Sequence, residues 1–169
     1  MPLPCIITPG QRYYPPAAVE FDYYIGPSGS DSNDGLSPST PWSITAINTK
    51  AGTYDGFSVG IMDGTYDLSA MTSVDAYAAV LQVEPGTEGS PTIIQAVSDS
   101  AAILDLGGNT KAAIGRWGSP TGQGYTEIRG LTVRNGARFG VQFSYASASD
   151  AVPGIVIDGC EIHDIVDAT

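Results

Sequence analysis

Four basic side chains in the second half of the chain have the chemistry to act on an acidic sugar: Arg129, Arg134, Arg138 and His163. Elimination within a uronic acid polymer needs a cation for the carboxylate, a base for the neighbouring proton and an acid for the leaving oxygen. Arg134 and His163 are equivalent in a sequence repeat, so we expect them about one strand spacing, ~4.8 Å, apart. Such a pair could bind an acidic sugar, although stacked pairs of this kind are more often ordinary surface, and no catalytic residue is assigned.

Carboxylates near the end of the chain offer a second chemistry, hydrolysis of a glycosidic bond. That reaction uses two carboxylates, ~5 Å apart for retention or roughly 6.5 to 9.5 Å apart for inversion of configuration. Asp residues at turns already have a structural reason to be there, which favours a solvated turn over a catalytic pair. The four candidates are Asp158, Glu161, Asp164 and Asp167.

Aromatic side chains can stack on sugar rings through their apolar faces. Trp42 follows Pro41 in a turn-rich segment and is expected in the core, whereas Trp117 is expected at the end of a strand. Tyr145 is a further candidate. The carbohydrate-contact residues predicted from the sequence are therefore Trp117, Arg134, Tyr145 and His163.

The sequence GSDSNDG could supply oxygen ligands for calcium from Asp31, Asn33 and Asp34. Its spacing departs from the EF-hand pattern in the position of the glycine and lacks the closing Glu, which favours a turn. We therefore expect no metal and no cofactor. The two cysteines, Cys5 and Cys160, have neither disulfide-framework nor metal-site spacing and are expected to be free thiols.

Charge narrows the range of partners. The formal net charge is −11, from 7 Lys and Arg against 18 Asp and Glu, so the chain should repel nucleic acid and anionic membrane surfaces. No stretch approaches the ~18 apolar residues of a membrane span, and the N-terminus lacks the features of a secretion signal. The expectation is a soluble protein made in the cytosol, the alternative being a secreted protein whose signal was removed.

Short apolar runs separated by turn residues predict an all-β protein. The residues Ser43 to Asn48 predict one or two helical turns. Linkers such as DGTYD, EPGTEGS, SDS and GGNT are too short for helical crossovers, so parallel strands would have to wind as a coil. The predicted strands are 21–25, 57–62, 79–83, 92–97, 102–106, 112–117 and 140–145.

An internal repeat supports the coil. IRGLTVRN (128–135) matches IDGCEIHD (157–164) at an offset of 29 residues, with Ile, Gly and two apolar positions in register. The glycine of each copy can take the bend between two strands of one coil. A period of this length is typical of a solenoid in which each unit packs on its neighbours. A β-sandwich is the alternative, but it does not require a copied motif.

The segments YYIGPSGSDSNDGLSPSTPWSI (Tyr23 to Ile44) and IMDGTY (Ile61 to Tyr66) resemble the opening segment of pectate-lyase-like right-handed parallel β-helix proteins. The resemblance covers most of the chain from residue 21. It implies a right-handed parallel β-helix that begins with a short helix. It does not imply a reaction, because the relatives include polysaccharide lyases, glycoside hydrolases, epimerases and phage tailspikes.

These observations predict a Pro-rich N-terminal arm or attachment segment over 1–20 and the first coils of the β-helix over 21–169. We expect the β-helix to continue beyond residue 169. The leading hypothesis is a phage or phage-like virion protein, a tailspike or fibre, that recognises host polysaccharide and joins other virion proteins through its arm, as a homotrimer. The alternatives are a secreted polysaccharide lyase or glycoside hydrolase, and a purely structural virion decoration protein.

Overall fold

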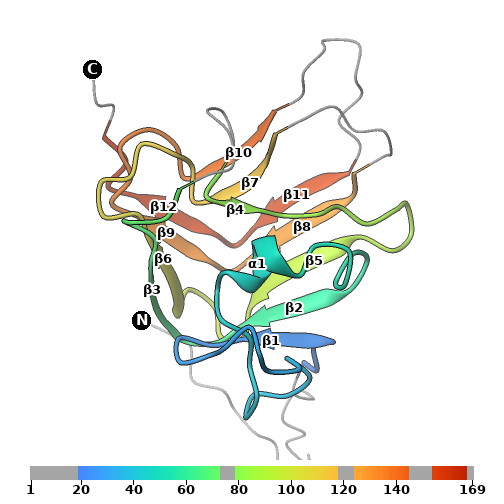
Figure 1. The fold of residues 1–169 in the computed structure, drawn as a ribbon. Helices are drawn as coiled ribbons and strands as arrows, with labels where there is room; N and C mark the ends of the chain where they lie inside the picture. Colours follow the sequence, from blue (N-terminus) through green and yellow to red (C-terminus); the bar gives the residue numbers. More distant parts are fainter. Residues whose placement is uncertain (1–18, 73–78, 118–123, 145–153, 167–169) are drawn as a thin grey trace, which may run out of the picture.

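The computed structural model describes residues 19–72, 79–117, 124–144 and 154–166, and this part of the chain consists largely of short strands (Figure 1). Twelve strands and one helix of four residues, α1 (Ala46–Thr49), make up the described regular structure. All pairings between these strands are parallel. The prediction of an all-β protein with parallel strands is confirmed.

The described strands form three sheets. After β1, the chain passes through the first, second and third sheets in the same order each time. The first sheet has the order β1 (Tyr23–Ile25), β2 (Ser58–Ile61), β5 (Thr92–Ala96), β8 (Thr126–Arg129), β11 (Ile155–Asp158). The second has the order β3 (Gly64–Asp67), β6 (Ala102–Asp105), β9 (Thr132–Arg134), β12 (Glu161–His163), and the third β4 (Leu81–Gln82), β7 (Ile114–Trp117), β10 (Val141–Ser144).

The two copies of the repeat lie side by side. Ile128 pairs with Ile157 between β8 and β11, and Arg134 pairs with His163 between β9 and β12, which is the offset predicted from the sequence. In each copy the strands of the first and second sheets are separated by a glycine with positive φ, Gly130 at 63° and Gly159 at 60°. These glycines therefore take the predicted bend, in a conformation that costs other residues steric strain.

The core is built from rows of apolar side chains that follow the register from strand to strand. Along β5, buried and partly buried residues alternate, as expected for a strand with one face in the core. Register neighbours in the first sheet, Val59, Ile94 and Ile128, are all buried. Leu104 and Val133 form a similar row in the second sheet.

One predicted linker proves to be a strand. DGTYD was expected to be a connection, but Gly64–Asp67 forms β3 and pairs with β6. The reason is Tyr66, which is buried and donates its hydroxyl hydrogen to the carbonyl of Met62. One inward-facing side chain is enough to hold this short strand against the core. Because its neighbours are polar, the sequence has no apolar run that would predict a strand here.

The segment between β1 and α1 covers the first end of the stack. Trp42 is buried, as predicted, and its ring stacks on Tyr23 at 4.5 Å between centroids. Its indole N–H donates to the carbonyl oxygen of Asn33. Gly35 has a φ of 72°, and a Cβ there would lie 2.5 Å from the indole ring, so the tight turn needs glycine.

The other end of the described stack presents apolar side chains to solvent. Ile157 and Ile162 continue the inward rows, yet they are 49% and 46% exposed. Cys160 lies in the short connection between β11 and β12 and is a half-buried free thiol. Cys5 lies outside the described residues. The single helix found in the described ranges is far too short to cross a bilayer.

Candidate functional site

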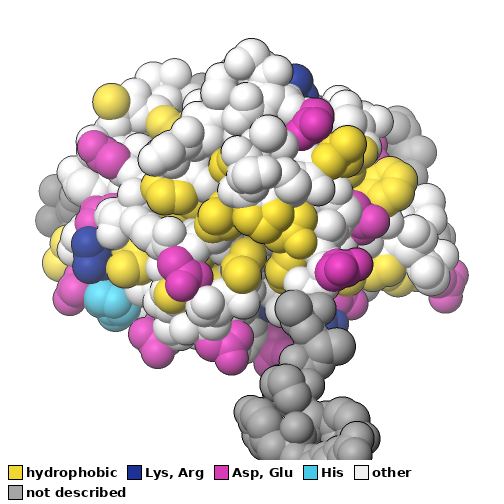
Figure 2. Space-filling model, turned by 90° about the horizontal axis from the view of Figure 1, so that it is seen from below, with side chains coloured by type: hydrophobic (Ala, Val, Ile, Leu, Met, Phe, Trp, Pro, Cys, Tyr) yellow, Lys and Arg dark blue, Asp and Glu magenta, His cyan; other side chains and the backbone are white. Residues whose placement is uncertain are grey.

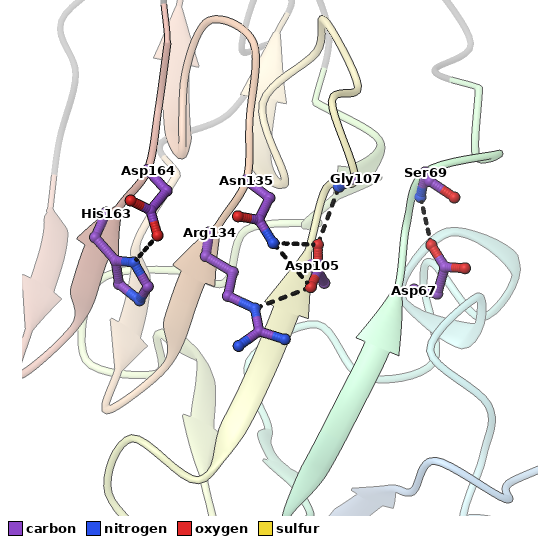
Figure 3. Close-up of polar contacts among 8 residues, drawn as sticks. All are labelled: Asp67, Ser69, Asp105, Gly107, Arg134, Asn135, His163 and Asp164. Atoms are coloured by element: carbon purple, nitrogen blue, oxygen red, sulfur yellow. Dashed lines mark hydrogen bonds and ion pairs between the residues drawn. The ribbon is translucent and has the colours of Figure 1, made fainter.

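A row of polar side chains runs across the outer face of the second sheet. Asp67, Asp105, Arg134 and His163 are register neighbours on β3, β6, β9 and β12, so each strand of the sheet contributes one member. Because successive side chains of a strand point to opposite faces and Leu104 and Val133 are buried, Asp105 and Arg134 point outward. Figure 3 shows the four side chains of this row. We call this set the polar row. It contains both residues of the pair predicted from the sequence, Arg134 and His163.

Asp105 is the centre of the polar row. Its carboxylate accepts hydrogen bonds from Nε of Arg134 at 2.9 Å, from the side-chain amide of Asn135 at 3.0 and 3.1 Å, and from the backbone N–H of Gly107 at 3.0 Å. The Asn135 hydrogen bond lowers the pKa of Asp105 below its usual value; burial opposes this, and Arg134 and Gly107 contribute further lowering. The carboxylate is therefore ionised at neutral pH and joins the neighbouring strands β6 and β9.

The turn after each strand repeats at the same place. Asn135 and Asp164, 29 positions apart in the repeat, both have positive φ values, 57° and 54°. The Asp164 carboxylate lies 2.8 Å from Nδ1 of His163. This contact fixes the imidazole and leaves Nε2, on the opposite edge of the ring, able to meet a ligand. Figure 3 shows His163 turned toward Asp164, while Arg134 and Asn135 point toward Asp105.

The other basic candidates lie away from the polar row. Arg129 is at the end of β8 in the first sheet and forms an ion pair with Glu127. Arg138 lies over the ring of Phe139, with its guanidinium carbon 5.0 Å from the ring centroid. The set predicted from the sequence therefore divides among three places, and only Arg134 and His163 are brought together.

One aromatic candidate, Trp117, lies in a strand of the third sheet. The backbone of Trp117 ends β7 and pairs with Ser144 of β10. Tyr145 lies outside the described residues, as does Asp167. Trp117 and Arg134 are therefore in strands of different sheets.

The carboxylates considered for hydrolysis also lie in different elements. Asp158 ends β11, while Glu161 begins β12 after the bend at Gly159. Asp164 is engaged with His163. Among the described residues, no three His, Cys, Asp or Glu side chains gather as a metal site would require.

The three residues considered for calcium make separate contacts. Asp31 accepts hydrogen bonds from Ser43, Thr45 and Thr49. Burial pushes the pKa of Asp31 upward, but the three hydroxyl donors and the nearby Lys50 outweigh it, and the pKa lies below its usual value. The Asn33 amide donates to the carbonyl of Pro41, and Asp34 accepts from Thr40. These contacts tie the opening turns to the segment before α1 and, through Thr49, to α1 itself.

A groove that sequence reasoning missed lies where the first sheet bends into the second. It is lined by Tyr24, Pro38, Met62, Asp63, Val97 and Ser98, and its volume is about 240 Å³. We call it the bend groove. Its walls come from β1, the opening segment and the turns after β2 and β5, which are far apart in the sequence and have no common motif. The strand register brings Met62 and Val97 together, because they directly follow the paired residues Ile61 and Ala96.

The lower face of the molecule combines apolar surface with negative charge. Figure 2 shows hydrophobic side chains gathered near the centre of this face, and most of the charged side chains around them are acidic. Such a surface suits an uncharged ligand better than an anionic one.

No family model, no curated protein and no solved structure matches this chain. Function therefore has to be inferred from the chain's own residues and their arrangement.

Proposed function

We propose that the three sheets are the sides of a right-handed parallel β-helix, and that this helix presents a polysaccharide-binding surface in a virion protein of the tailspike or fibre type. The strand order supports the helix, because the chain passes through the three sheets repeatedly in one sequence. Neighbours in the first sheet are 35, 34 and 29 residues apart, as in Ser58 with Ile93, Thr92 with Thr126, and Thr126 with Ile155. Crossovers between parallel strands are right-handed in nearly all proteins, which supports the hand.

The observation that carries the functional proposal is the polar row. Its members repeat at the strand spacing, about 4.8 Å, so hydrogen-bonding groups extend along the stack rather than around one point. A glycan chain is a long ligand with hydroxyl groups at regular intervals, and it can follow such a row. The charges of Asp105 and Arg134 are paired with each other, which leaves a surface suited to hydroxyl groups.

The remaining parts of the proposal concern assembly. We assign the segment 1–20 to attachment to other virion proteins, on the basis of its Pro-rich composition. We propose a homotrimer, as the resemblance of Tyr23 to Ile44 to tailspike relatives suggests. We therefore propose a location in the virion, and we assign no bond cleavage to the protein.

Binding to host polysaccharides tests the proposal. The intact chain should bind at least one bacterial capsular or O-antigen polysaccharide when each is immobilised and titrated. Replacing Arg134 and His163 together by Gln should weaken that binding by about tenfold, the effect of losing roughly 1.4 kcal/mol. Arg129→Gln is the matched control, because it removes an arginine from the first sheet, and it should leave affinity within about twofold.

The outcomes separate the alternatives. Binding without release of reducing ends or unsaturated products supports recognition alone, whereas product release would support the lyase or hydrolase alternative. Failure to bind any polysaccharide in the panel would contradict the proposal and favour a purely structural protein. Binding that is unaffected by the double substitution would remove the polar row from the contact surface.

A further inference from the structure

The bend groove combines apolar walls with one carboxylate. Met62 and Val97 lie in consecutive coils, and the backbone N–H of each bonds to the preceding strand, Met62 to Ile25 and Val97 to Ile61. Val97 is 44% exposed and contributes apolar surface to the groove. Pro38 of the opening segment closes the other side.

Tyr24 is held in place before any ligand arrives. Its hydroxyl accepts a hydrogen bond from the backbone N–H of Phe21 at 3.3 Å, and the two rings meet edge to face with centroids 5.8 Å apart. Phe21 is buried, because its ring occupies the space left by Gly60, the register partner of Tyr24. A ring fixed in this way binds without loss of side-chain freedom, which favours affinity.

Asp63 supplies the polar group of the groove. Its Oδ2 accepts a hydrogen bond from the hydroxyl of Ser98 at 3.1 Å. This bond crosses from one coil to the next and orients the carboxylate. The other oxygen, Oδ1, can accept hydrogen bonds from a ligand, and ionised acceptors form stronger hydrogen bonds than neutral ones.

We propose that the bend groove binds one neutral sugar ring of a polysaccharide, with the Tyr24 ring against the C–H face of the sugar and Asp63 accepting from its hydroxyls. This inference rests on the proposed glycan-binding function and adds a second contact site with a stated substrate class. Aromatic and apolar walls with one oriented acceptor match the two faces of a sugar ring. A volume of about 240 Å³ lies below the range for drug-sized ligands, which suits a single ring.

The negative charge of the groove and of the whole chain favours a neutral sugar as the ligand. Asp63 carries a negative charge in the groove, and the whole chain has a formal charge of −11. A uronate or phosphate group would meet repulsion here. The polar row can contact further units of the same polymer, since it lies on the neighbouring sheet.

Titration of the intact chain with defined oligosaccharides tests the groove. The probes are neutral glucose-, mannose- and galactose-based oligosaccharides and a galacturonate oligosaccharide of equal length. Tyr24→Ala should weaken binding of the preferred neutral probe by about tenfold, while Tyr24→Phe should retain it. Asp63→Asn should reduce the preference for neutral over uronate probes.

Matched controls use the same changes elsewhere on the surface. Phe139→Ala removes an exposed aromatic ring outside the groove, and Glu88→Gln removes an exposed carboxylate on the turn after β4; both should bind as the wild type does. Folding of each variant is checked by circular dichroism and thermal unfolding. If Tyr24→Ala does not fold, Val97→Ser takes its place, because Val97 is largely exposed and its change should be tolerated.

Each result has a separate meaning. Loss of neutral-probe binding in the groove variants, with unchanged controls, supports the inference. The groove proposal is overturned if the neutral probe still binds with wild-type affinity after Asp63→Asn and after Tyr24→Ala or its replacement Val97→Ser. That result would leave the proposed function intact. Tighter binding of the uronate probe overturns the neutral class. Absence of binding to any glycan overturns both the groove and the proposed function.

Discussion

Asp105 connects two neighbouring strands of the second sheet, β6 and β9, through one carboxylate. It binds Arg134 of β9, Asn135 just after β9, and the backbone of Gly107 just after β6. The sequence did not indicate this connection, although Asp105 precedes Arg134 by the same 29 residues as the repeat. The segments around them, ILDLG and TVRNG, have only the final glycine in common. The pairing of Arg134 with His163 was predictable because both copies of their motif are recognisable.

Removing the Asp105 carboxylate should destabilise the fold. Asp105→Ala is expected to lower the free energy of unfolding by about 1–2 kcal/mol, because Arg134 and Asn135 lose a charged acceptor. The measurement is urea unfolding followed by circular dichroism. Asp67→Ala is the control, since Asp67 accepts from the backbone and side chain of its own turn residue, Ser69, and should matter less. A larger effect at Asp67 would contradict the role given to Asp105.

Acid should remove the same stabilisation. The pKa of Asp105 is lowered in the fold, mainly by the Asn135 hydrogen bond, so its folded value lies below the ordinary value of 3.8. A lowered folded pKa gives stability that is complete above the unfolded value and is lost as the pH falls through the folded value. Wild type should therefore exceed Asp105→Asn in free energy of unfolding at neutral pH, and this difference should shrink as the pH falls below 3.8. Urea unfolding at both pH values measures it. A difference that stays constant into strong acid would contradict this assignment.

Glycines set the corners and the close approaches between strands. The glycine in each repeat copy predicted a bend, and the structure confirms it at Gly130 and Gly159. Alternating strands such as β5 were predictable because one face meets the core. The strand Gly64–Asp67 was not predictable in this way, because only Tyr66 points toward the core there. The bend groove was also beyond prediction, since it depends on the register between coils with loops of unequal length.

Substitution at Gly130 should separate conformational strain from packing. Gly130→Ala should cost about 1–2 kcal/mol of unfolding free energy, because alanine is strained at positive φ. A Cβ there would also lie 3.1 Å from the Asp99 carboxylate. Gly130→Asn should cost less if strain dominates, because asparagine tolerates this conformation, and chemical denaturation would show the order. Equal costs would indicate that crowding beside Asp99 determines the effect.

Gly115, the one glycine in the described strands of the third sheet, should be sensitive to substitution. A Cβ at Gly115 would lie 1.8 Å from the carbonyl oxygen of its register partner Gln142, and φ at Gly115 is 156°. Gly115→Ala should therefore separate β7 from β10 and cost more than about 2 kcal/mol. Hydrogen exchange should show faster exchange of the β10 amides, with the first sheet less affected. Unchanged protection of β10 would contradict the close approach of the two strands.

The whole described molecule is a stack with two different ends. The first end is covered by Trp42 and the opening segment, whereas the other presents Ile157 and Ile162 to solvent. Between the ends, outward side chains line up from coil to coil, which places the polar row and the bend groove on adjoining parts of the surface. The sequence predicted the parallel strands, the repeat distance and the pairing of Arg134 with His163, but not that Asp67 and Asp105 would join the same row.

Cross-strand nuclear Overhauser contacts in the isotopically labelled chain test the central claim, the parallel stacking of coils, most directly. The account predicts amide-to-Hα contacts in parallel register between Ile94 and Ile128 and between Leu104 and Val133. It also predicts that Arg134 contacts both Asp105 and His163. Close Hα-to-Hα contacts between these strands would indicate antiparallel pairing, as in a β-sandwich, and would contradict the stack and the surfaces built on it.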